Sequence, residues 1–265
     1  MTTVSQDSET LLHAVTDVAA AAGKVAFSYF GSRLDIERKD DGSPVTIADR
    51  SAEQTARDWI EKHFPEDGVA GEELGAIRPD ARRRWIIDPI DGTKSFVHGV
   101  PLWGTLVAVC EGGAVLAGAA CFPALGETLA AAVGRGCWWN GSRCHVSSVS
   151  SVRESLVLAS ECVFSAPDRN DGWLRLSNAA ALSRTWGDCY GYLLVATGRA
   201  EVMVDPILMD WDAAALYPAI IEAGGTFTSW SGELTPFKRS AVATNLAVGD
   251  EARTLLGVGL PRAAS

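Results

Sequence analysis

The apolar positions at the start of the chain repeat with the period of an α-helix. Within residues 8–30 one helical face collects apolar side chains, namely Leu11, Leu12, Val15, Val18 and Ala19. Because residues three and four apart share a helix face, this spacing predicts an amphipathic helix. A second helix is predicted from Ile47 to about Lys62, with Thr46 as its cap and Pro65 beyond its end.

Shorter apolar runs, separated by glycine and polar residues, predict strands through the rest of the first half. These strands lie at 36–39, 68–71, 84–87, 103–111 and 114–122, and residues 40–44 form a loop. The 127–147 region alternates short strands around Gly134, Gly136 and Asn140-Gly141, a pattern that is typical of hairpins.

The second half alternates strands with helices. Predicted strands lie at 155–160, 183–186, 200–205, 226–230 and 241–244, and predicted helices lie at 170–181, 189–197 and 212–223. The last helix stops at Gly224-Gly225. This alternation predicts an α/β (α+β) layered fold. We expect a single domain over residues 1–265, with approximate halves 8–150 and 151–255.

Charge and cysteine usage narrow the class of protein. The formal net charge of −10 disfavours nucleic acid and anionic membranes as partners. No run of 18 uncharged apolar residues is present, so no membrane span is expected, and the charged N-terminal helix is not a signal peptide. The six cysteines include no C-x-x-C pair, which favours free thiols in a cytoplasmic protein. A disulfide between Cys137 and Cys144, which flank a predicted turn, is the disfavoured alternative.

The segment Trp85–Lys94 carries the most chemical information. An apolar run ends in Asp88 and Asp91, followed by the small residues Gly92 and Thr93. Paired carboxylates at a strand end suit Mg²⁺, and the N–H groups of a small-residue turn suit a phosphate oxyanion. Taken alone, the motif is equally an Asp/Gly turn after a core strand.

Two further acidic elements have the same character. Val69–Glu73 is a short apolar piece ending in glycine and carboxylates, and Met209–Ala215 places carboxylates before an apolar helix, with Asp210 as the expected N-cap. Like charges brought together from distant segments need a cation between them, so the three elements predict a multi-metal site.

The motifs resemble those of the inositol monophosphatase superfamily of Mg²⁺-dependent, lithium-sensitive phosphatases. The matching segments are Asp88-Pro-Ile-Asp-Gly-Thr93, Trp211-Asp-Ala-Ala-Ala215 with Ala223-Gly-Gly225, Gly71-Glu72-Glu73, and Lys39 through Ser43-Pro-Val-Thr46 to Asp49. The match runs from about residue 10 to 250. It implies a five-layered α-β-α-β-α sandwich of the inositol monophosphatase / fructose-1,6-bisphosphatase type, and a homodimer.

The resemblance also implies the metal ligands. Glu72, Asp88 and the Ile90 carbonyl would hold a first Mg²⁺, and Asp88 would bridge to a second ion bound by Asp91 and Asp212. Two to three ions are expected in each subunit.

The catalytic pair implied by the resemblance is Asp49 and Thr93, which would orient and deprotonate the attacking water. A carboxylate that accepts from a threonine hydroxyl is a sensible base relay, worth about 10²–10⁴ in rate. The alternative is that Asp49 supports the first turn of its helix. The backbone N–H groups of Gly92 and Thr93 would bind the phosphate.

Substrate choice depends on the segment Trp186–Tyr192, which resembles the Gly-Asp-Cys-Tyr-Gly-Tyr element of the histidinol-phosphate phosphatase branch. Asp188 adds a carboxylate that can pair with the amine of histidinol phosphate, whereas inositol phosphate offers no cation. The alternative for Asp188 is a helix N-cap. Asp205 occupies the position of a carboxylate that contacts substrate hydroxyls, and Arg184 is expected to support Asp205.

These observations favour a Mg²⁺-dependent phosphomonoesterase that hydrolyses histidinol phosphate in histidine biosynthesis. The alternatives are an inositol monophosphatase or a broad-specificity sugar-phosphate phosphatase. A non-catalytic regulatory relative is less favoured, because the chain retains the metal-binding carboxylates and Thr93.

Overall fold

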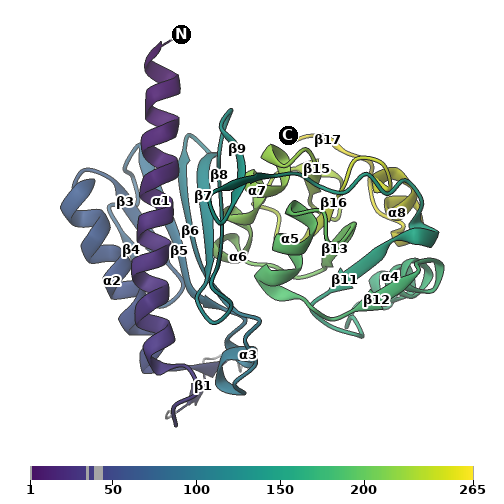
Figure 1. The fold of residues 1–265 in the computed structure, drawn as a ribbon, viewed down its shortest axis with the longest axis horizontal. Coiled ribbons are helices and arrows are strands. Elements are labelled where there is room, and N and C mark those ends of the chain that lie inside the picture. Colours follow the sequence, from purple (N-terminus) through teal and green to yellow (C-terminus); the bar gives the residue numbers. More distant parts are fainter. Residues whose placement is uncertain (1, 34–35, 39–43, 265) are drawn as a thin grey trace.

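The computed structural model describes residues 2–33, 36–38 and 44–264, and it has five layers (Figure 1). The first layer contains α1 (Thr2–Tyr29) and α2 (Ile47–His63), which cover an eight-stranded sheet. The middle layer contains α5 (Asp188–Ala196), α6 (Asp210–Ala214) and α7 (Leu216–Glu222). A five-stranded sheet follows, and α4 (Pro167–Ala179) and α8 (Gly249–Leu256) cover its outer face. The predicted α-β-α-β-α sandwich is confirmed.

The first sheet has the order β10-β9-β8-β7-β6-β5-β3-β4. Its strands are β3 (Gly68–Gly71), β4 (Gly75–Ile77), β5 (Arg83–Asp91), β6 (Gly104–Glu111), β7 (Ala114–Phe122), β8 (Glu127–Ala132), β9 (Gly136–Trp139) and β10 (Ser142–Cys144). Only the β3–β5 pair is parallel among these neighbours. The register of β5 against β6 shifts between Asp88 and Asp91, around Pro89, which has no N–H to donate to the ladder.

The second sheet has the order β12-β11-β13-β16-β14. Its strands are β11 (Leu156–Ala159), β12 (Leu182–Arg184), β13 (Val202–Asp205), β14 (Thr226–Thr228) and β16 (Ala241–Thr244). Strand β11 is parallel to both β12 and β13, so these three strands end at the same edge. The smaller elements are β1 (Glu37–Arg38), β2 (Pro44–Val45), α3 (Thr93–Val97), a 3-10 turn at Val152–Glu154, β15 (Glu233–Leu234) and β17 (Arg262–Ala263).

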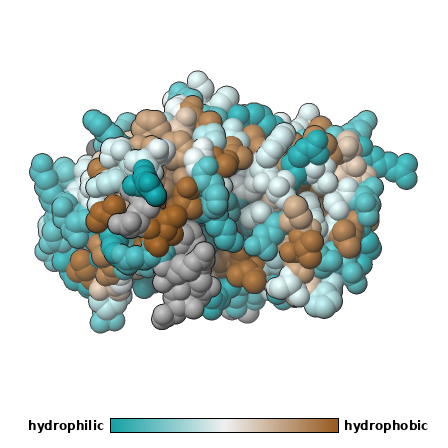
Figure 2. Space-filling view, turned by 90° about the horizontal axis from the view of Figure 1, so that it is seen from below, coloured by the Kyte–Doolittle hydropathy of each residue, from teal (hydrophilic) through white to brown (hydrophobic). Residues whose placement is uncertain are grey.

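Three hydrophobic clusters hold the layers together. The first joins α1 and α2 to one face of the large sheet and contains the predicted apolar face of α1, including Leu11, Val15 and Val18. The second fills the space between the two sheets around the middle helices, and the third packs α4 and α8 on the outer face of the small sheet. On the face shown in Figure 2, hydrophobic residues form separate patches between hydrophilic ones, as expected of a surface rather than a core.

Several predicted boundaries differ from the observed ones. Helix α1 starts at Thr2 rather than near residue 8, and α4 starts at Pro167, where proline favours the first helical turn. The predicted helix 212–223 is two helices, α6 and α7. Pro218 explains the break, because it lacks the N–H that would bond the Ala214 carbonyl. Lys39 and the rest of the predicted loop up to Ser43 lie outside the described residues.

Two other sequence-based expectations can be compared with the structure. No helix in the described ranges is long and apolar enough to cross a membrane. All six cysteines are free thiols, and Cys137 and Cys144 face each other across the β9–β10 turn without a disulfide.

The close approach of the middle helices to the large sheet occurs at Gly118 on β7. A Cβ atom at Gly118 would lie 2.3 Å from the backbone carbonyl oxygen of Ala215, at the junction of α6 and α7. Because α6 carries Asp212 and packs on β5 and β6, this contact sets how near Asp212 comes to the end of β5.

We therefore expect Gly118→Ala to lower the free energy of unfolding by about 1–3 kcal/mol, because backbone has to move to admit the methyl group. Denaturant unfolding measures the loss. Ala114→Val, at the exposed end of the same strand, serves as the control and should change stability by less than about 0.5 kcal/mol. Equal stability of Gly118→Ala and the parent protein would contradict the close approach.

Candidate metal centre and adjoining pocket

Three carboxylates from distant segments meet where β5 ends and α6 begins. One oxygen atom from each of Asp88, Asp91 and Asp212 lies within 4.8 Å of the other two. Asp88 is buried, and Asp91 and Asp212 are half-buried. The structure thus brings together residues that are more than a hundred positions apart in the sequence.

Local hydrogen bonds fix the direction of each carboxylate. Asp88 Oδ1 accepts from the Ile90 N–H at 3.0 Å, and Asp91 Oδ2 accepts from the N–H of Cys189 in the first turn of α5. Asp212 Oδ2 accepts from the Met209 N–H at 2.8 Å. The expected N-cap role of Asp210 is therefore wrong: Met209 is the N-cap residue, and the side chain that turns back to it belongs to Asp212.

The buried carboxylates of the cluster repel one another, and a bound cation would offset this repulsion. Burial, followed by repulsion from neighbouring carboxylates, raises the pKa of Asp88 and of Asp91 well above the usual range. Burial also raises the pKa of Asp212 to about 6. A buried group of oxygen donors that repel one another matches the donor set of Mg²⁺, whose charge would offset that repulsion. The residues present therefore fit a hard divalent cation.

Glu72 and Ile90, the other expected ligands, border this cluster. Burial is the main cause of the raised pKa of Asp49, Asp88 and Asp212, and the charge of Glu72 adds to each rise, so Glu72 lies close enough to repel all three. The Glu72 N–H donates to the Ile87 carbonyl of β5 at 3.2 Å. The Ile90 carbonyl accepts from Thr93 Oγ1 at 2.9 Å, and a carbonyl oxygen has two lone pairs with which to bind partners.

Asp49 and Thr93 are not hydrogen-bonded to each other. Asp49 completes a capping box at the start of α2, where its Oδ2 accepts from the N–H of Thr46 at 2.8 Å and from its hydroxyl at 2.7 Å. The only hydroxyl proton of Thr93 is directed at the Ile90 carbonyl. The structure thus shows the helix-supporting contact of Asp49 and not the expected relay.

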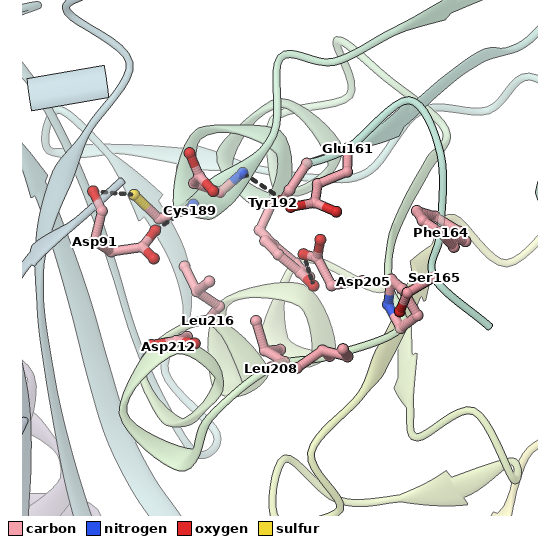
Figure 3. A pocket seen from close by; sticks show the side chains of 14 residues that line it. Asp91, Glu161, Phe164, Ser165, Cys189, Tyr192, Asp205, Leu208, Asp212 and Leu216 are labelled. Atoms are coloured by element: carbon pink, nitrogen blue, oxygen red, sulfur yellow. Dashed lines mark hydrogen bonds between the residues drawn. The ribbon is translucent and has the colours of Figure 1, made fainter. Parts of the chain in front are cut away.

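A cavity of about 260 Å³ adjoins the carboxylate cluster (Figure 3). Asp91 and Asp212 lie at one end of the view, and Phe164 and Ser165 lie at the other. The lining residues are Asp91, Ser160, Glu161, Phe164, Ser165, Asp188, Cys189, Tyr192, Asp205, Pro206, Ile207, Leu208, Asp212 and Leu216. The cavity therefore combines carboxylates with an apolar wall.

Asp205 lies deep in this cavity, at the end of β13. Its Oδ2 accepts from the Tyr192 hydroxyl at 2.8 Å, and burial raises its pKa to about 8.

Arg184, expected to support Asp205, does not do so. Arg184 is exposed and donates to the Ser183 carbonyl, on an edge strand that β11 separates from β13.

Asp188 occupies the first position of α5 with a left-handed backbone, at φ 49°. Gly187 is the N-cap residue, and the N–H groups of the first turn donate to the side chains of Ser160 and Asp91, so the capping alternative for Asp188 is wrong. A Cβ atom at Gly92 would lie 3.2 Å from Asp188 Oδ2, so this carboxylate lies against the Gly92 turn. Burial raises the pKa of Asp188, and the charge of Lys94 opposes that effect.

Sequence reasoning missed Ser160, Glu161 and Phe164, which follow the end of β11. Ser160 Oγ accepts from the Asp188 N–H at 2.8 Å, and Glu161 is 3.7 Å from Lys94. A signal did exist, because residues that follow neighbouring parallel strands meet at one sheet edge, and β11 and β13 are such strands.

The family is decided by comparison with known proteins. The model of the inositol monophosphatase family matches residues 7–257. The chain belongs to this family. It is accordingly a phosphoric monoester hydrolase, and the sequence-based assignment to the superfamily is confirmed.

Relatives with assigned names cover nearly the whole chain. A histidinol-phosphatase of Chlorobaculum parvum is 43% identical over 251 residues, which cover 94% of this chain and 97% of that protein. A histidinol-phosphatase of Mycobacterium tuberculosis is 40% identical over 262 residues, covering 97% of this chain and 100% of that protein. Among solved structures, an inositol monophosphatase from Zymomonas mobilis aligns with a TM-score of 0.83 at 30% identity, covering 94% of this chain and 98% of that one.

The raised pKa values of the carboxylate cluster predict how the stability of the fold depends on pH and on Mg²⁺. Raised carboxyl pKa values mean that the metal-free folded enzyme binds more protons than the unfolded chain above pH 4. Its stability should therefore fall as pH rises from about 4 through the raised pKa values, such as that of Asp212 near 6. Mg²⁺ competes with these protons, so Mg²⁺ should raise the melting temperature more at pH 8 than at pH 5.

Thermal unfolding with and without Mg²⁺ at the two pH values measures this difference. Asp212→Asn should lose most of the Mg²⁺-dependent rise. Asp210→Asn, an exposed position two residues earlier on α6, should keep it. An undiminished rise in Asp212→Asn would remove Asp212 from the metal centre.

Proposed function

We propose that this enzyme is a Mg²⁺-dependent phosphomonoesterase that hydrolyses histidinol phosphate to histidinol and phosphate. The observation that carries the proposal is the cavity beside the carboxylate cluster, which is lined by Asp188, Asp205 and Glu161. Carboxylates that surround a small cavity suit a substrate with a cationic amine, and an anionic phosphate reaches such a place only beside bound cations.

For the metals, we propose that Glu72, Asp88 and the Ile90 carbonyl hold one Mg²⁺. Asp88, Asp91 and Asp212 would hold a second. A third ion would bring the number to the upper end of the two to three ions expected in each subunit. Bound Mg²⁺ supplies positive charge that polarises the phosphoryl group and offsets the charge that develops on attacking and leaving oxygens.

The residues of the chain then bind and orient the substrate. We propose that the N–H groups of Gly92 and Thr93 donate to phosphate oxygens, since the φ of Gly92 is +83° and α3 starts immediately after it. The turn has no side chain at Gly92 that would keep a phosphate away. Asp188 lies against this turn, so an amine paired with Asp188 stays close to the phosphate.

The deeper part of the cavity receives the rest of the substrate. Asp205, whose pKa of about 8 keeps it protonated at neutral pH, can both donate and accept hydrogen bonds there. Phe164, Leu208 and Leu216 offer apolar surface for the imidazole ring. Family resemblance favours a homodimer, and the free thiols favour the cytoplasm.

The alternative substrate is inositol monophosphate, which would leave the charge of Asp188 without a partner. A non-catalytic relative is disfavoured by the convergence of Asp88, Asp91 and Asp212.

A substrate panel tests the function. Phosphate release under Mg²⁺ is measured for histidinol phosphate, inositol 1-phosphate, fructose 1,6-bisphosphate and glycerol 2-phosphate, with and without a chelator. We expect the highest kcat/KM for histidinol phosphate and no turnover in the chelator. Preference for inositol 1-phosphate would overturn the substrate, and full turnover in the chelator would overturn the metal mechanism.

The role of Asp188 is tested by Asp188→Asn. Loss of one charge-assisted contact should lower kcat/KM for histidinol phosphate by about tenfold to a hundredfold, equivalent to roughly 1.5–3 kcal/mol. Glycerol 2-phosphate, which has no amine, should be hydrolysed almost as before. Asp168→Asn, at an exposed position in the first turn of α4, is the matched control. Equal losses on both substrates would show that Asp188 does not recognise the amine.

We also propose that Asp49 and Thr93 act on the attacking water. Asp49→Asn and Thr93→Ala should each lower kcat by about 10²-fold or more. If the two form a relay during turnover, the double variant should be little worse than the poorer single variant. Multiplicative losses, measured at saturating Mg²⁺, would instead match the separate partners that the structure shows, Thr46 and Ile90.

A further inference from the structure

Helix α2 buries an ion pair beneath the loop that carries Glu72. Glu53 is 0% exposed and Arg57 is 4% exposed, and their side chains meet at 2.6 Å between Arg57 Nη2 and Glu53 Oε1. Arg57 Nε also donates to Glu53 Oε1 at 2.8 Å. Burying two charges is unfavourable unless further hydrogen bonds satisfy them, so the remaining partners of the pair show what it does.

Those partners all belong to the loop from Gly71 to Gly75, between β3 and β4. Glu53 Oε2 accepts from the Glu73 N–H at 2.7 Å, and Glu53 Oε1 accepts from the Leu74 N–H at 3.2 Å. Arg57 Nη2 donates to the Gly75 carbonyl. The ion pair therefore binds both N–H and C=O groups of the residues that directly follow Glu72.

Gly71 is packed against the same carboxylate from the other side of Glu72. A Cβ atom at Gly71 would lie 2.1 Å from Glu53 Oε1, so the carboxylate occupies the space of a side chain. Between these contacts, the Glu72 N–H donates to the Ile87 carbonyl, one residue before Asp88. The backbone is thus held immediately before, at and after Glu72.

The charge balance of the pair suits this position. Glu53 is neutralised by Arg57, so it can hold the loop without adding a further net charge to the acidic cluster. Within the described residues, the exposed pair that Glu61 of the same helix forms with Arg78 makes no hydrogen bond to this loop.

We propose that Glu53, held by Arg57, is a positioning residue that fixes the Gly71–Gly75 loop so that Glu72 is already placed for a divalent cation. The proposal rests on the role of Glu72 as a metal ligand under the proposed function. Partners that orient metal ligands in this way are typically worth about 10- to 100-fold in metal affinity.

Two variants disrupt the contact between the Glu53 carboxylate and the Gly71–Gly75 loop, one changing Glu53 and the other changing the loop. Glu53→Gln removes the charge and one of the two acceptor oxygens. Gly71→Ala retains both charged side chains but introduces a methyl group where the Glu53 carboxylate lies. Glu61→Gln makes the same chemical change as the first variant on the same helix, at an exposed glutamate that is also paired with an arginine, and is the control.

Two measurements are made without substrate. Hydrogen exchange of the Glu73 and Leu74 amides is followed in the metal-free enzyme, and Mg²⁺ affinity is measured by calorimetry. We expect both variants to exchange these amides faster and to bind Mg²⁺ about 10- to 100-fold more weakly, with Glu61→Gln unchanged. In turnover assays, the deficit should shrink as Mg²⁺ is raised, because the loss lies in metal binding.

Faster exchange with unchanged Mg²⁺ affinity would overturn the proposal, since Glu53 would then only stabilise the loop. Unchanged exchange would also overturn it, because the contacts would not hold the loop. If neither variant folds, the proposal is tested by hydrogen exchange in the parent enzyme with and without Mg²⁺. A ligand that binds only the positioned loop must stabilise it, so Mg²⁺ has to slow exchange of the two amides, and no slowing overturns the proposal.

The outcomes separate this proposal from the proposed function. An enzyme that binds Mg²⁺ with the expected dependence on Glu53, but does not hydrolyse histidinol phosphate, refutes the substrate and supports the role of Glu53. An enzyme that binds no Mg²⁺ overturns both.

Discussion

The site depends on the mutual repulsion of carboxylates that the fold forces together. Asp88, Asp91 and Asp212 are held within a few ångströms, and burial makes their ionised forms unfavourable until a cation is present. Each is fixed by a backbone N–H, from Ile90, Cys189 and Met209 respectively. Three hydrophobic clusters supply the rigidity that keeps these like charges from moving apart. The packing of the layers therefore stabilises an arrangement that is electrostatically unfavourable by itself.

The same constraint organises the neighbouring pocket. The parallel strands β11 and β13 end beside the cluster and add Glu161 and Asp205, so acidic side chains extend from the carboxylate cluster into the cavity, with Asp205 protonated at neutral pH. The φ of +49° places Asp188 in a backbone conformation that is uncommon for a residue other than glycine. Strain of this kind is often found at functional sites, and here it lies between the Gly92 turn and the cavity. A cationic substrate would relieve the charge of this pocket in the way that a divalent cation would relieve that of the cluster.

Local signals in the sequence are sufficient for an α/β layered fold and for the acidic elements that meet at its centre, whereas the five-layered sandwich and the choice of Asp212 as a ligand follow only from the family resemblance. The strand ending in Asp88 and Asp91 and the Thr46 cap can be read within a few residues. The sequence failed where a contact depends on elements far apart. Arg184 is predicted to support Asp205, but β11 lies between their strands. The Tyr192 hydroxyl donates to Asp205 instead. Pro218 is a local signal for the break between α6 and α7, although the apolar pattern of residues 212–223 continues past it. Glu53 and Arg57 are four residues apart on α2, and this spacing alone does not reveal their burial, which depends on the loop packed over them.

Helix α2 connects these observations, since it carries Asp49 in its first turn and Glu53 one turn later. Both carboxylates are buried, and each is satisfied differently. Asp49 accepts from Thr46 within its own helix start, whereas Glu53 is paired with Arg57 and accepts from the Glu72 loop. Burial is the main cause of the raised pKa of Asp49, and the charge of Glu72 adds to it, so Asp49 lies within the electrostatic field of the carboxylate cluster. One helix thus carries a buried carboxylate that is exposed to the charge of Glu72 and another that Arg57 neutralises. The second can be buried deeply because Arg57 neutralises it, and it therefore holds the loop that carries Glu72 without adding net charge beside the carboxylate cluster.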